Sequence, residues 1–142
     1  MSVLPSGVSF AAATTASYVH RIKTTSGDAF RNVTIELLGA AAPAPAISFP
    51  GAASVTKIRE SARGSAFRVE LEPDASVKLT GAGADTLFVC LKPATFMLST
   101  GGRPEDQWNC DTGQFRLLES TPTTIIRAAT PVPGALVALI LN

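Results

Sequence analysis

The strongest constraint on the fold is a two-residue alternation of apolar and polar side chains, which recurs in short segments along the chain. The segment AFRVELE at 66–72 shows it most clearly, with Phe67, Val69 and Leu71 separated by charged residues. Successive side chains of a β-strand point to opposite faces of the sheet, so this pattern predicts a strand with one buried face. No sustained helical spacing of apolar residues occurs, and a single helical turn near 57–63 is the most helix that we expect.

Turn residues separate further segments of this kind at intervals of roughly 8 to 12 residues. Pro73 and Asp74 lie between 66–72 and the segment SVKLT at 76–80, and we predict that these two strands form a hairpin. The continuously apolar TLFVCLK at 86–92 is typical of a strand buried on both faces. Other strands are expected at 18–24, 30–38, 46–49, 55–60, 115–119, 123–130 and 135–142. The sequence therefore predicts an all-β fold, a single antiparallel β-sandwich or barrel domain.

The 142-residue chain has the size of one domain, and both of its ends lack charged side chains. We expect an extended N-terminal arm at 1–17, followed by the β-sandwich domain at 18–142. The arm either lies along a neighbouring subunit or is a disordered start, whereas the apolar segment 135–141 is expected to be a core strand. One long loop is predicted at about 99–114, because STGGRPEDQWNCDTG combines turn residues with acids.

Charge and composition disfavour several classes of protein. The 12 Lys and Arg against 11 Asp and Glu give a net charge of +1, which argues against a dedicated nucleic-acid binder. No apolar run approaches the ~20 residues of a membrane-spanning helix, and the N-terminus does not match a secretory signal. We therefore expect synthesis in the cytoplasm and no membrane partner. The two cysteines, Cys90 and Cys110, lack the spacing of a redox or zinc motif and are expected to be structural thiols, and the sequence leaves open whether they pair.

No catalytic motif is found in the sequence. The single histidine, His20, lies in a predicted strand, and the sequence places no aspartate near it to orient the ring. No nucleophile elbow and no phosphate-binding glycine loop occurs. Glu105, Asp106 and Asp111 could offer oxygen ligands to calcium, but their spacing does not match a calcium loop, and solvated acids are the simpler interpretation. We predict no catalytic residue, no cofactor and no metal, and hence no enzymatic activity.

Trp108, the only tryptophan of the chain, has three candidate roles in the predicted loop. It could pack on the core and hold the loop in place, which is a common use of a single tryptophan. It could instead anchor a protein interface together with Arg103, since both residue types are enriched where partners bury surface. It could also stack on a sugar in a carbohydrate-binding module. The sequence leaves the three roles open.

These features together favour a structural component of a large assembly. A charged fraction of 16% is low for a chain that remains a free monomer, so we expect partners to cover part of its surface. We predict a bacteriophage virion protein, a capsid decoration or cement protein or a small tail component, which is made in the host cytoplasm and joins coat or tail subunits as a homo-oligomer. A carbohydrate-binding module is the alternative. The predicted interface residues are Val3, Leu4, Val8, Phe10, Arg103 and Trp108.

Overall fold

The computed structural model describes residues 27, 48–49, 54–80, 84–119, 123–129, 131 and 133–141. They form nine β-strands and no helix. In chain order the strands are β1 (Val55–Ser61), β2 (Gly64–Leu71), β3 (Ser76–Thr80), β4 (Asp85–Lys92), β5 (Ala94–Thr100), β6 (Asp106–Cys110), β7 (Phe115–Leu118), β8 (Thr123–Ala128) and β9 (Gly134–Leu141). Within this described part, no helix is long and apolar enough to cross a membrane.

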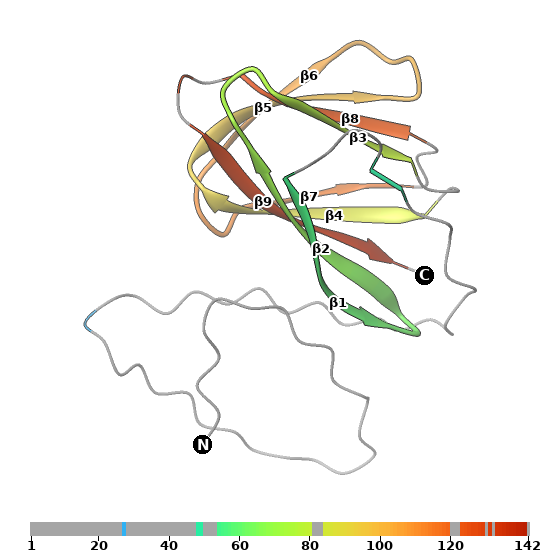
Figure 1. Cartoon of the computed structure of the whole chain (residues 1–142). Helices are drawn as coiled ribbons and strands as arrows, with labels where there is room; N and C mark the ends of the chain where they lie inside the picture. Colours follow the sequence, from blue (N-terminus) through green and yellow to red (C-terminus); the bar gives the residue numbers. More distant parts are fainter. Residues whose placement is uncertain are drawn as a thin grey trace.

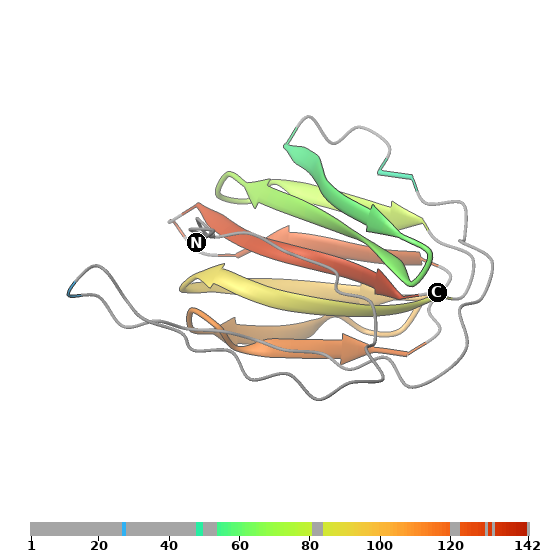
Figure 2. The same ribbon diagram turned by 90° about the horizontal axis from the view of Figure 1, so that it is seen from below.

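The strands form two sheets that lie face to face (Figure 1, Figure 2). The five-stranded sheet has the order β1-β2-β9-β4-β7, and the four-stranded sheet has the order β3-β8-β5-β6. Every pair of neighbouring strands is antiparallel. The prediction of an all-β antiparallel sandwich or barrel is therefore confirmed.

The centre of the five-stranded sheet is β9, which pairs with β2 on one side and with β4 on the other. All of its residues from Gly134 to Ile140 are buried. Its sequence GALVALIL is apolar throughout, as expected of a strand that is covered on both faces. The predicted C-terminal core strand is thus confirmed, and the predicted strand at 86–92 is confirmed as the largely buried β4.

The predicted hairpin of 66–72 with 76–80 is wrong, although both segments are strands. They lie in different sheets, because β2 pairs with β1 and β9 whereas β3 pairs with β8. A turn in which the Ala75 N–H donates to the carbonyl oxygen of Glu72 (3.0 Å) carries the chain from one sheet to the other. Alternation identifies the inward side chains, but both sheets of a sandwich bury one face, so it does not assign a strand to a sheet.

The helical turn that we allowed near 57–63 is also wrong. This segment is β1 and the turn that joins it to β2 in a hairpin, with Ser61 opposite Gly64. The short strand expected at 55–60 is therefore confirmed. Side chains from Thr56 to Glu60 are exposed on both faces of β1.

The stretch at 99–114 is not one long loop, because β6 occupies its middle. This strand pairs with β5, and Trp108 lies opposite Phe96. Its five-residue sequence DQWNC alternates as a strand does, with Trp108 and Cys110 buried and their neighbours exposed. The glycines and acids on either side obscured a pattern that is too short to predict a strand without further information.

Four predicted features lie outside the described residues: the arm at 1–17, the strands at 18–24 and 30–38, and His20. The brief strand expected at 46–49 is described in part. Ser48 forms an isolated antiparallel bridge with Thr80, at the edge of the four-stranded sheet. The predicted domain limits are not tested and remain predictions.

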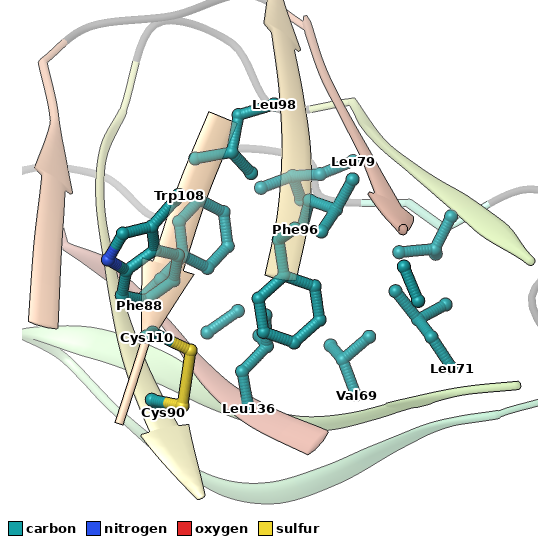
Figure 3. Close-up of a cluster of buried hydrophobic side chains, with 14 of the residues drawn as sticks. Val69, Leu71, Leu79, Phe88, Cys90, Phe96, Leu98, Trp108, Cys110 and Leu136 are labelled. Atoms are coloured by element: carbon teal, nitrogen blue, oxygen red, sulfur yellow. A yellow bond between two sulfur atoms is a disulfide. The ribbon is translucent and has the colours of Figure 1, made fainter. Parts of the chain in front are cut away.

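A shared core of apolar side chains fills the space between the two sheets (Figure 3). Phe96 of β5 is fully buried in this core. Its ring lies against Gly134 of β9, where an added Cβ would be 2.7 Å from two carbons of the ring. The packing of the two sheets at this point therefore requires a residue without a side chain.

We expect Gly134→Ala to lower the free energy of unfolding by about 1–3 kcal/mol, since the added methyl group overlaps the Phe96 ring. Chemical denaturation followed by circular dichroism measures this change. In a Phe96→Leu background the side chain is smaller, so the same substitution should cost much less. Equal costs in the two backgrounds would contradict the overlap.

Candidate functional site

Trp108 points into the space between the sheets (Figure 3). The residue is 9% exposed, and its ring centroid lies 5.9 Å from that of Phe96, with the two rings inclined by 36°. Of the three roles considered for Trp108, packing on the core is the one that the structure supports. A ring buried in this way is not available to stack on a sugar or to anchor a partner.

Apolar side chains fill the rest of the interior. Those that are less than 2% exposed include Phe88, Phe96, Ile126, Leu136 and Ile140. In the described ranges, the buried polar side chains are those of Ser65, Thr86 and Thr124, which carry no charge. The described part of the chain therefore places no carboxylate, amine or imidazole in the core.

Among the residues that the structure describes, the donor atoms that a transition metal needs are not gathered between the sheets. Mouths and interiors of β-barrels are common places for ligands, and a transition metal there would take imidazole, carboxylate or thiolate ligands. Within the described ranges no three His, Cys, Asp or Glu side chains lie close enough to hold a metal. The whole sequence has one histidine and two cysteines, and the two cysteines are bonded to each other. The interior residues that are described do not fit such a metal.

Two of the three acids considered as calcium ligands take part in ion pairs. Arg116 of β7 pairs with Asp106 of β6, and Arg127 of β8 pairs with Glu105 at 3.3 Å. Asp111 lies in the turn after β6. In the described part of the chain these three acids do not form a group that could hold a metal.

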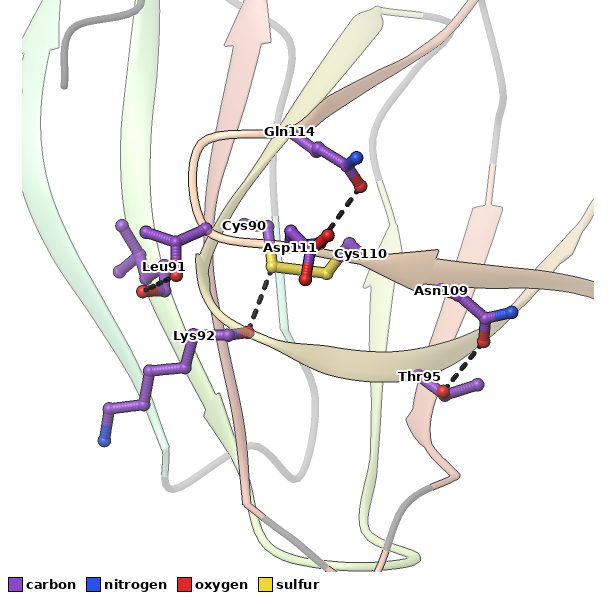
Figure 4. The surroundings of a disulfide bond; sticks show 9 residues. Cys90, Leu91, Lys92, Thr95, Asn109, Cys110, Asp111 and Gln114 are labelled. Atoms are coloured by element: carbon purple, nitrogen blue, oxygen red, sulfur yellow. Dashed lines mark hydrogen bonds between the residues drawn. A yellow bond between two sulfur atoms is a disulfide. The ribbon is translucent and has the colours of Figure 1, made fainter.

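Cys90 and Cys110 form a disulfide that joins β4 of one sheet to β6 of the other (Figure 4). Their Cα atoms are 6.2 Å apart, and both residues are buried. The backbone of Cys90 also holds the turn after β6, since its N–H donates to the carbonyl oxygen of Gln114 and the Gly113 N–H donates to its carbonyl oxygen, both at 2.8 Å. The expected structural thiols are thus corrected to a structural disulfide. Spacing in the sequence could not reveal that these two strands face each other.

Two open hollows lie on the surface near the ends of these strands. The first, of about 370 Å³, lies beside the disulfide and is lined by Pro93, Ala94, Thr95, Asn109, Cys110, Asp111 and Gln114. Its polar groups bond to one another (Figure 4): Thr95 Oγ1 donates to Asn109 Oδ1 at 2.8 Å, and the Asp111 N–H donates to Gln114 Oε1 at 3.0 Å. The second, of about 250 Å³, is lined by Glu70, Leu71, Glu72, Lys92, Pro133, Gly134 and Ala135. Both hollows are open to solvent and are lined by polar as well as apolar residues, whereas a small-molecule site is typically enclosed and mostly apolar.

The edge strand β7 carries two of the four large apolar side chains that are exposed in the described residues. Phe115 is 62% exposed and Leu117 is 48% exposed. They lie opposite Val89 and Leu87 of β4, whose side chains belong to an apolar cluster on the outer face of the five-stranded sheet. No described strand pairs with the other side of β7. We call this strand, residues 115–118, the β7 edge.

Sequence reasoning missed the β7 edge. Binary patterning of FRLL at 115–118 would place Phe115 and Leu117 inside and Arg116 outside. The structure has the reverse orientation, because Arg116 pairs with Asp106 and Leu118 packs against the core. No signal within the strand itself could have indicated this orientation.

Two of the residues predicted as an interface, Arg103 and Trp108, lie in the described ranges. Arg103 lies in the exposed turn between β5 and β6, whereas Trp108 is buried, so the two do not share a surface. Four of the predicted residues lie outside the described ranges: Val3, Leu4, Val8 and Phe10. Their role remains a prediction.

Comparisons with known proteins identify the architecture. No protein-family model matches the sequence, and no curated protein matches it significantly. Among solved structures, a double-stranded β-helix protein from Klebsiella pneumoniae gives a TM-score of 0.55 at 9% identity, over 65% of this chain and 78% of that one. A cupin domain from Bordetella pertussis gives 0.52 at 10% identity, over 73% and 99%. A protein described as a predicted oxalate decarboxylase, from Thermotoga maritima, gives 0.51 at 14% identity, over 61% and 77%. The fold is therefore a cupin-like double-stranded β-helix, and at these identities the likeness concerns the fold alone.

These neighbours correct the predicted function. The prediction of a bacteriophage virion component, with a virion location, is wrong, because the solved proteins that the chain resembles are cupin-domain proteins and not particle proteins. Jelly-roll architecture is shared by capsid domains and cupins, so a pattern of short strands could not separate them. The carbohydrate-binding alternative at Trp108 is wrong because the ring is buried. We also predicted a homo-oligomer without nucleic-acid or membrane partners. None of these findings tests that prediction, and it remains a prediction.

Reduction of the disulfide is expected to lower the free energy of unfolding by about 3 kcal/mol, because the bond closes a loop between residues 20 positions apart. Urea denaturation with and without reductant measures the change. The double variant Cys90→Ala/Cys110→Ala is the control, and reductant should leave its stability unchanged. Two free thiols in the unreduced, unfolded protein would contradict the bond.

Proposed function

We propose that this chain is a non-enzymatic cupin-like domain that acts by binding another protein at its surface. One observation carries the proposal: apolar side chains and a disulfide fill the volume between the sheets, where a barrel of this kind could hold a ligand. A buried site for chemistry would need polar groups aimed at a reacting atom. The described interior offers three uncharged hydroxyl side chains, those of Ser65, Thr86 and Thr124.

The β7 edge supports binding to a protein. Phe115 and Leu117 are exposed side by side on one face of an edge strand, next to the apolar outer face of the sheet. Exposed apolar residues on an edge strand favour pairing with another chain, since the strand also offers its backbone N–H and C=O groups. The low charged fraction of the chain, 16%, supports a protein partner in the same way.

The disulfide adds a condition to this function. Disulfides form and persist in oxidising surroundings and are rare in a reducing cytosol. We therefore propose that the domain acts in an oxidising compartment. There the bond between β4 and β6 would hold the turn that leads into the β7 edge.

Metal binding tests the proposal directly. We expect the purified protein to contain no stoichiometric transition metal, and its melting temperature to be unchanged by Mn²⁺, Fe²⁺, Ni²⁺ or Zn²⁺. A metal bound to the folded state at 100 times its dissociation constant would stabilise it by about 2.7 kcal/mol, which a thermal scan detects easily. Elemental analysis that finds about one metal ion per chain, lost together with stability on chelation, would overturn the proposed function.

A further inference from the structure

We propose that the N-terminal stretch of this chain, residues 1–47, covers the outer apolar face of the five-stranded sheet, and that segment 30–38 makes the contact. This inference goes beyond the proposed function and does not depend on it. No described strand lies over this face, because all nine belong to the two sheets and the other sheet packs on the opposite face. The residues that are nevertheless buried on it are Ala66, Leu87, Val137 and Leu139.

The outer face of the other sheet shows how exposed an uncovered apolar side chain is. Ile125 lies there on β8, an interior strand of the four-stranded sheet, and is 39% exposed. Leu139 lies on β9, an interior strand of the five-stranded sheet, and is 7% exposed. One of the two residues opposite Leu139 is the small Ala66, so its neighbours within the sheet do not explain the burial. The difference indicates that a further part of this chain lies over β9.

The N-terminal stretch is the part that is long enough to reach β9. The other gaps in the described ranges hold at most four residues each, too few to cross the face and return. Ser48 bridges Thr80 of β3, and Phe49 lies against Phe67 of β2 with ring centroids 4.8 Å apart. The stretch therefore ends at the side of the sandwich where β3 and β1 are the edge strands. The ten residues from 39 to 48 can span up to about 33 Å when extended, which suffices to pass around β1.

Segment 30–38 has the apolar row that such a cover needs. Its sequence FRNVTIELL places Val33, Ile35 and Leu37 on one side of an extended chain, with polar residues on the other side. The three apolar side chains would extend over about 13 Å, whereas three neighbouring strands are about 10 Å across. The row is thus long enough to cover β2, β9 and β4, which carry the buried residues of the face.

The margin of the same face at β7 stays exposed. Exposure rises from 7% at Leu139 of β9 to 48% at Leu117 and 62% at Phe115 of β7. The strand β4 lies between β9 and β7, so a cover centred on β9 ends before β7. The apolar surface that this face offers to a partner is then the β7 edge and not the whole sheet.

Photo-cross-linking of the full chain tests the contact. The photoreactive residue p-benzoylphenylalanine is placed at position 35, in the apolar row, and the folded protein is irradiated. We expect insertion into β9 or β4 of the same chain, mapped by mass spectrometry. The same probe at position 34 is the matched control, because it points away from the sheet, and it should insert there with less than about a tenth of the yield.

Paired substitutions in the full chain test the burial. Ile35→Asp should lower the melting temperature by at least about 5 °C, because it places a charge in the apolar row. It should also raise the fluorescence of the dye anilinonaphthalene sulfonate about threefold, since this dye binds exposed apolar surface. Thr34→Asp adds the same charge one position away and should change neither quantity. Circular dichroism checks that the sandwich stays folded in both variants.

Insertion from position 35 into another part of the chain, or equal insertion from positions 34 and 35, would overturn the inference. Products that join two chains would assign the cover to a second copy and would overturn it as well. Equal effects of Ile35→Asp and Thr34→Asp would show that the row is not buried. A stoichiometric metal would overturn the proposed function and would leave this inference in place.

Discussion

Phe96 contacts both sheets: its ring lies against Gly134 of the five-stranded sheet and beside Trp108 in its own sheet. The disulfide of Cys90 with Cys110 closes the neighbouring part of the same space. These contacts occupy the volume that a more open barrel of this architecture would leave for a ligand. The proposed function follows from this packing, because a filled interior leaves recognition to the surface.

The surface in turn depends on the orientation of β7, which pairs with β4 and packs Leu118 against the core. Arg116 turns inward along the edge of the sandwich and pairs with Asp106, which connects the edge strands of the two sheets. Since successive side chains of a strand alternate, this orientation turns Phe115 and Leu117 outward. An apolar edge is a hazard for a free monomer and an advantage for a domain that binds another chain. The orientation of β7 that packs Leu118 against the core therefore also produces the surface that we assign to binding.

The sequence was informative wherever one face of a strand is buried. The strands at 66–72, 76–80 and 86–92 were predictable because burial imposes alternation or a continuous apolar run. The sheet to which each strand belongs was not predictable, because a row of apolar side chains can be buried equally well from either sheet. The disulfide and the orientation of the β7 edge depend on contacts between residues distant in the sequence, and β6 is too short for its pattern to stand out. Function was predicted wrongly because neutral charge and short strands are common to capsid and cupin-like domains.

The quenching of Trp108 fluorescence by acrylamide tests the closed interior most directly, because this is the only tryptophan of the chain. A ring that packs against Phe96 inside the sandwich should emit at short wavelength and should be quenched weakly in the folded protein. Quenching should become strong only when denaturant unfolds the chain. Strong quenching of the folded protein, equal to that of the unfolded chain, would show that the interior is open and would contradict the account.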